Sequence, residues 1–186
     1  MRTPVEIQMR AELAEAVTLA VWPIDEVAET IRDDAVEFAR QQVDGEDAGL
    51  MSLLGRRDFL EIFKYGLESK IAEVLAATDR NVLAVYAVEA DLNPEAEISG
   101  ELPLDVTAHL LVHVSVPSAA LQAFIGALDR ALLASLKELP SPLFRERAFI
   151  LDVNLITEQD IQQRIGFAKL LTSPFAPPLK VWQREE

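Results

Sequence analysis

The chain has 186 residues, of which half are hydrophobic and about a quarter are charged, and it contains no cysteine. This length suits a single domain over residues 1–186, with a core large enough to fold without covalent cross-links. The lack of cysteine excludes disulfides, thiolate metal sites and a cysteine nucleophile. A net charge of −14 disfavours binding to nucleic acid or to anionic membranes, because both need a basic surface. Residues 1–6 lack the basic-then-apolar order of a secretion signal, and we expect a cytoplasmic protein.

Residues 1–80 are predicted to form a helical amino-terminal part. Residues 3–6, Thr-Pro-Val-Glu, carry the signals of a helix start, and apolar residues then recur every four positions up to Trp22-Pro23. A second helix is expected from Asp25, which can cap it, to about residue 45.

Residues 50–55 are expected to form a short apolar turn or helix. Asp58 and Glu61 have the spacing of a capping box, and apolar residues follow them at helical spacing as far as residue 75. A turn at residues 79–81 then ends the helical part.

The pattern changes at residue 82. Residues 81–88 are apolar and rich in β-branched side chains, which is typical of a strand that is buried on both faces. A loop or wide hairpin follows at residues 91–103, and residues 105–116 then alternate as a half-buried strand does. The polar positions of this strand interrupt the longest uncharged run, residues 106–128, which is therefore not expected to span a membrane. One face carries Val106, Ala108, Leu110, Val112, Val114 and Val116, and the other carries Thr107, His109, Leu111, His113 and Ser115.

A long helix is expected over residues 117–140, a third strand over 148–156 and a last helix from Thr157 to about residue 171. The strand–helix–strand order predicts that the second and third strands are parallel, while the first two can pair antiparallel. Residues 81–172 are thus expected to form an α+β (mixed α/β) core, a small mixed sheet of about three to four strands packed with helices. Residues 173–186 are expected to be an extended tail that apolar side chains pin to the body or to a partner.

The two histidines, His109 and His113, are expected on the same face of one strand. Four residues of a strand separate their Cα atoms by about 13 Å, so a single metal ion cannot bind both. Either the histidines lie on the wetter side of the strand without a further role, or they form a polar site with acids of a neighbouring strand, such as Asp152 or Glu89. Asp105, Asp152 and the two histidines are the candidate catalytic residues, and such a site would titrate near neutral pH.

Residues 89–105 carry six acids and no basic residue. Clustered carboxylates can hold a divalent cation loosely, with Asp91, Glu95 and Glu97 as candidate ligands, although the spacing does not match that of a calcium loop. The alternatives are a solvated acidic loop and a docking surface for a basic protein partner, whose binding high salt would weaken.

The order of elements over residues 82–156 resembles that of nucleotidyltransferase cores. Those cores hold magnesium and a nucleotide with a Gly-Ser pair, two carboxylates on one strand and a third carboxylate on a later strand. In this comparison Asp105 takes the place of the first carboxylate and Asp152 that of the third, but Thr107 stands where the second is required and the Gly-Ser pair is missing. The resemblance therefore implies at best an inactive relative.

Motifs for phosphate-binding loops, dinucleotide binding, zinc proteases and serine hydrolases are absent from the sequence, and no cofactor is expected. The leading hypothesis is a non-enzymatic structural, regulatory or partner-binding protein that self-associates, by default as a homodimer through apolar helical faces. The alternative is a small-ligand or metal-dependent enzyme, including a degenerate nucleotidyltransferase-like domain, with its site on the strand face that carries His109 and His113. The sequence is compatible with both an enzymatic and a non-enzymatic role.

Overall fold

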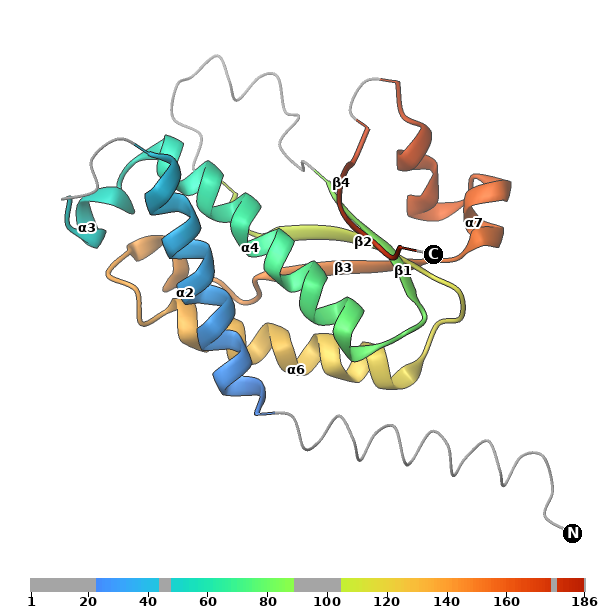
Figure 1. Cartoon of the computed structure of the whole chain (residues 1–186), viewed down its shortest axis with the longest axis horizontal. Helices are drawn as coiled ribbons and strands as arrows, with labels where there is room; N and C mark the ends of the chain where they lie inside the picture. Colours follow the sequence, from blue (N-terminus) through green and yellow to red (C-terminus); the bar gives the residue numbers. More distant parts are fainter. Residues whose placement is uncertain (1–22, 44–47, 89–104, 175–176, 186) are drawn as a thin grey trace, which may run out of the picture.

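The computed structural model describes residues 23–43, 48–88, 105–174 and 177–185, which form helices packed on a four-stranded mixed sheet (Figure 1). The strands are β1 (Val82–Ala87), β2 (Ala108–Val114), β3 (Leu151–Ile156) and β4 (Leu179–Gln183), and their order is β3-β2-β1-β4. β1 pairs antiparallel with both β2 and β4, and β2 pairs parallel with β3. The predicted fold class and the two predicted strand pairings are confirmed.

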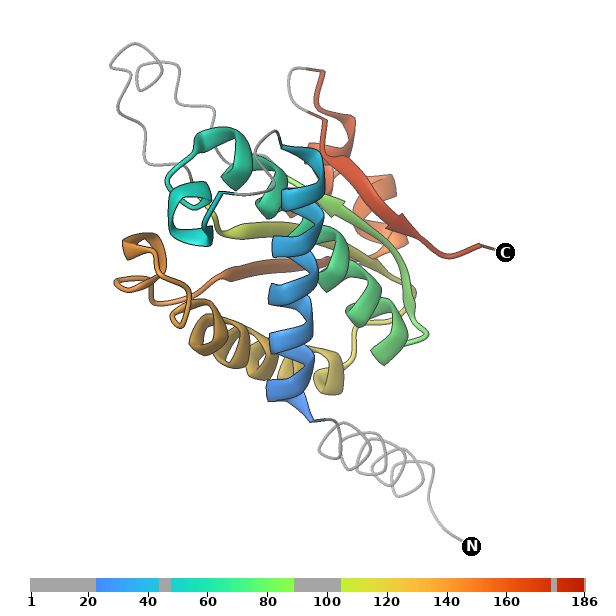
Figure 2. The same cartoon turned by 60° about the vertical axis from the view of Figure 1, so that its left-hand side comes forward.

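Helices cover one face of the sheet in two layers. α4 (Arg57–Thr78) and α6 (Ala119–Leu136) pack on the strands, and α2 (Ile24–Gln42) lies across this helix pair, in front of it in Figure 2. The short helix α3 (Leu50–Leu53) connects α2 to α4 along the chain. The predicted alternation of β2 is confirmed, because the face that carries Leu110 and Val112 is buried in the main core beneath α4 and α6. Among the described helices, α6 has the length and apolar composition of a membrane span, a test that core helices of soluble proteins also pass.

A glycine allows α2 to approach α4 closely. A Cβ atom at Gly66 of α4 would lie 2.9 Å from Cδ1 of Phe38 and 3.4 Å from Cα of Ala35, both on α2. Gly66 costs α4 some helix propensity. This cost is offset by the close packing of α2 against α4. The contact between the two helices continues along α4 to Lys70 and Val74.

The opposite face of the sheet has a thinner cover, formed by α7 (Glu158–Gln163) and the 3-10 helix η2 (Gly166–Thr172). A small cluster centred on Leu111, Ile156 and Ala168 joins this cover to β2 and β3. The prediction of one helix from Thr157 to residue 171 is correct at its start, where Thr157 and Asp160 form a capping box. It is wrong in its middle, because Arg164 has a φ of 53° and ends α7 in the left-handed conformation.

Three other expectations need correction. Two predicted caps lie within the first turn of their helices: Asp58 in α4, which begins at Arg57, and Asp25 in α2, which begins at Ile24. The second and third strands are shorter than the patterns of residues 105–116 and 148–156 indicated. The tail forms a fourth strand, β4, beside β1, while its Val181 and Trp182 pack against the core as expected. The helix expected over residues 3–22 lies outside the described residues.

Candidate functional site

A cluster of charged and polar side chains, which we call the histidine cluster, joins the starts of β2 and β3 on the thinly covered face. It consists of Asp105, Thr107, His109, Arg147 and Asp152. His109 Nε2 lies 2.9 Å from Asp105 Oδ2, and its Nδ1 lies 2.9 Å from Asp152 Oδ2. Arg147 Nη1 donates to Asp105 Oδ1 at 2.8 Å and to the Thr107 hydroxyl at 2.6 Å. The cluster thus ties the start of β2 to β3 and to the segment that precedes β3.

The parallel register of β2 and β3 brings His109 and Asp152 together. These two residues are direct partners across the ladder, so their side chains leave the same face of the sheet side by side. Asp105 is positioned differently, by the turn before β2, in which its Oδ1 accepts the N–H of Thr107 at 2.9 Å. The two carboxylates therefore reach opposite nitrogens of one imidazole ring.

This geometry determines how protons can be shared in the cluster. A carboxylate can only accept hydrogen bonds, so both contacts of His109 are hydrogen bonds at once only when both ring nitrogens carry a proton. In that form the charges of His109 and Arg147 balance those of Asp105 and Asp152. Burial alone raises the pKa of Asp105, but hydrogen bonds from His109, Thr107 and Arg147 outweigh it and hold this pKa well below its usual value.

His113 lies apart from the cluster. Its Nε2 atom is buried and 3.6 Å from Oε2 of Glu158 in α7, and it has no hydrogen-bond partner among the described residues. Of the four candidate catalytic residues, the structure therefore brings together Asp105, His109 and Asp152, and it places His113 one strand-face position beyond Leu111 under the α7 cover.

Arg147 was not predicted as a member of the site. This arginine contacts Asp105 across 42 positions of the chain, and it lies among other charged residues before β3, so no local pattern distinguished it. Thr107 was placed on the correct strand face, but nothing in the sequence indicated its contact with Arg147. The acidic candidates Asp91, Glu95 and Glu97 lie outside the described residues.

The cluster is arranged to hold its own groups rather than to converge on a ligand. Asp105 and Asp152 occupy both nitrogens of His109, so these three side chains do not point at one common position. Within the described residues, no group of three or more His, Asp or Glu side chains has the arrangement of a metal site. Acid–base work by His109 would require one carboxylate to leave, and Asp152, whose side chain is 49 % exposed, is better placed to do so than Asp105, at 27 %.

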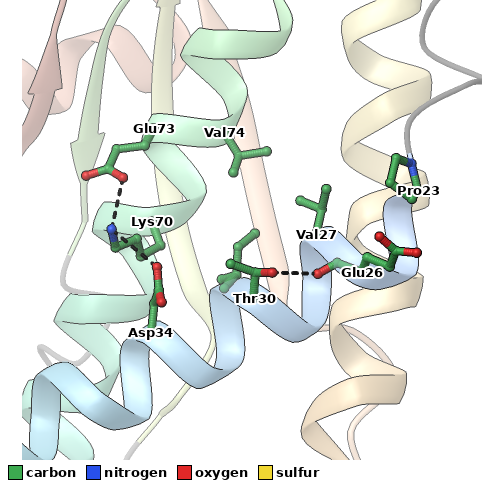
Figure 3. Close-up of a pocket in the computed structure, with 9 residues that line it drawn as sticks. Pro23, Glu26, Val27, Thr30, Asp34, Lys70, Glu73 and Val74 are labelled. Carbon is green, nitrogen blue, oxygen red and sulfur yellow. Dashed lines mark hydrogen bonds and ion pairs between the residues drawn. The ribbon is translucent and has the colours of Figure 1, made fainter.

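The second candidate site is a groove of about 350 Å³ between α2 and α4, on the other side of the sheet (Figure 3). Val27 and Ile31 of α2 and Val74 of α4 form its apolar part. Its volume is at the lower end of the range of ligand pockets, roughly 300–1,000 Å³. We call it the α2–α4 groove, and the rest of its lining comes from Pro23, Glu26, Thr30, Asp34, Lys70 and Glu73.

No protein family, curated protein or solved structure matches this chain in comparisons of sequence and fold. What the chain does is therefore inferred from its own residues.

Proposed function

We propose that the chain is a non-enzymatic protein-binding domain, which takes up apolar side chains of a partner segment in the α2–α4 groove. The observation that carries this proposal is the groove itself, where Val27, Ile31 and Val74 line an opening between two helices. Apolar surface at an open seam between helices is typical of proteins that bind an amphipathic helix. The histidine cluster supports the same choice, because His109 already engages both of its ring nitrogens.

The groove can accept side chains of a partner but not a whole helix. A volume of about 350 Å³ holds a few aliphatic side chains, while the backbone of the partner would remain outside. Two or three anchors at helical spacing would suit a seam between helices, since residues three and four apart lie on one helix face. The expected affinity is modest, because few apolar groups leave water.

A model peptide tests the proposal without knowledge of the natural partner. The probe is an amphipathic peptide of about five helical turns, with a leucine stripe and an otherwise uncharged, glutamine-rich face. Titrated into the full chain, it should shift backbone amide signals of α2 and α4 around the groove. Val27→Ser should weaken binding by about fourfold for each methyl group withdrawn from contact, whereas Val36→Ser, at a half-buried valine of α2 outside the groove, should not. Unchanged amide signals at millimolar peptide, or shifts confined to the histidine cluster, would refute the proposal.

Self-association is the second part of the proposal. Its support is a set of large apolar side chains outside the groove, of which Phe149, Ile165 and Phe167 are each about half exposed. Ile165 and Phe167 flank Gly166, the first residue of η2, which has a φ of 53°. A second copy could cover Ile165 and Phe167 and leave the α2–α4 groove free.

A further inference from the structure

We propose that the segment bound in the α2–α4 groove is a basic amphipathic helix, with its apolar side chains in the groove and its lysines or arginines against the acidic surface of α2. This inference rests on the binding function proposed above and specifies the partner. Its basis is charge complementarity between such a helix and the described surface of the groove.

The rim of the groove has an excess of negative charge. Three acids, Glu26, Asp34 and Glu73, line it together with a single base, Lys70. Lys70 Nζ lies 3.2 Å from Glu73 Oε2 and 3.4 Å from Asp34 Oδ2, so one lysine serves two carboxylates (Figure 3). Hydrogen bonding to Glu73 is the largest cause that raises the pKa of Lys70 above its usual value, so the lysine stays charged. The rim therefore keeps a net charge of −2.

The negative surface continues from the groove along α2. This helix contains six acids and two arginines, and Asp33 and Glu37 are exposed on it next to the rim. Arg32 offsets the charge of Asp33 only in part, because its guanidinium contacts both Asp33 at 2.7 Å and Glu138 at 2.8 Å. A partner helix that lies along the groove thus meets carboxylates on the side that faces α2.

Charge also favours this partner over two other possible occupants of the groove. A second copy of the chain carries a net charge of −14, so on average its surface is repelled by the acidic rim. Residues 1–22 of the same chain have apolar residues at regular spacing in their sequence, but they contain only two arginines against three glutamates. A segment of another protein with two to four lysines or arginines beside its apolar stripe fits both the apolar lining of the groove and its acidic rim.

Three peptides that differ only in their polar face provide the test. They share the leucine stripe of the probe described above and carry lysine, glutamine or glutamate on the polar face, and fluorescence anisotropy measures their binding to the full chain. At low salt the lysine peptide should bind about tenfold more tightly than the glutamine peptide, and the glutamate peptide more weakly than both. At about 0.5 M salt the three affinities should converge to within about threefold.

Two charge variants test whether the preference for the lysine peptide arises at the rim of the groove. Glu26→Gln removes a carboxylate of the rim and should lower the affinity for the lysine peptide about two- to threefold. Glu29→Gln is the matched control, because Glu29 is exposed on the same helix one turn away but does not line the groove. The affinity for the glutamine peptide should be unchanged in both variants.

The possible failures are distinguishable. If the glutamine peptide binds in the groove and the lysine peptide binds no more tightly, the inference about charge is wrong and the binding function stands. If none of the peptides binds, the binding function itself is refuted. If groove amide signals shift with protein concentration alone, the occupant is a second copy. If a synthetic peptide of residues 1–22 binds more tightly than the lysine peptide, the occupant is the chain's own segment. Either of the last two results would overturn the proposal of a basic partner.

Discussion

Replacement of Asp105 by asparagine tests whether the histidine cluster holds the fold together at the start of β2. Asp105 accepts three hydrogen bonds, from the Thr107 N–H at 2.9 Å, from His109 Nε2 at 2.9 Å and from Arg147 Nη1 at 2.8 Å. In Asp105→Asn one carboxylate oxygen becomes an amide nitrogen, which cannot accept the proton that its partner offers. The variant loses at least one charge-assisted hydrogen bond and the attraction to Arg147.

The expected loss in the free energy of unfolding is about 2 kcal/mol at pH 7, since hydrogen bonds to charged groups contribute about 1.5–3 kcal/mol and the site is mostly buried. Asp152→Asn is the matched control. The Asp152 side chain is 49 % exposed and contacts the other ring nitrogen of His109, so its loss should cost no more than about 0.5–1 kcal/mol. Urea denaturation followed by circular dichroism measures both values.

The effect of Asp105→Asn should also depend on pH, and the sign follows from the lowered pKa of Asp105. A carboxyl with a lower pKa in the folded state contributes stability that is complete above its unfolded pKa of about 3.9 and is lost as the pH falls through the folded value. The gap in the free energy of unfolding between the unchanged protein and Asp105→Asn should therefore narrow as the pH falls below about pH 4. A cost under about 0.5 kcal/mol at pH 7, or a gap that does not narrow below about pH 4, would refute this account of the cluster.

Two further predictions concern α7 and the oligomeric state. Arg164→Gly should raise the free energy of unfolding by about 0.5–1 kcal/mol, because glycine adopts the left-handed conformation at the end of α7 without the steric cost that arginine has there. Urea denaturation measures this change, and a loss of stability would contradict the prediction. Self-association should give a dimer mass in light scattering at tens of micromolar protein, and Phe167→Ser should shift it toward the monomer, whereas a strict monomer before any substitution would contradict the prediction.

The pattern of apolar residues was sufficient to predict the fold class. The alternation along β2 and the stripes of α2, α4 and α6 depend only on neighbours in the chain, because each element presents one apolar face with a fixed period. The errors lie at element ends, within the last predicted helix and in the tail, which forms the unexpected strand β4. Arg164 interrupts the last helix in a conformation that its residue type does not favour, and α4 begins two residues earlier than a cap at Asp58 implied.

The candidate site was predictable only in part. His109 and Asp152 could be selected from the sequence because they are polar residues within apolar strands, and Asp105 because it begins the alternating segment of residues 105–116. The parallel pairing of β2 and β3 was also expected. Their contacts depend on the register of that pairing, which sets His109 directly beside Asp152, 43 positions away. A shift of one residue would have turned the two side chains to opposite faces.

Local periodicity and composition by themselves determined that this chain packs helices on a small mixed sheet and carries an acidic surface. The tertiary structure alone decided that Asp105 and Asp152 share the ring of His109, that Arg147 joins them and that the tail becomes β4. It also decided that Val27 and Val74 meet in an open groove with an acidic rim, a feature with no signature in the sequence. The physical reason is that the period of an element depends on neighbouring residues, whereas a site depends on the register and packing of elements far apart in the chain.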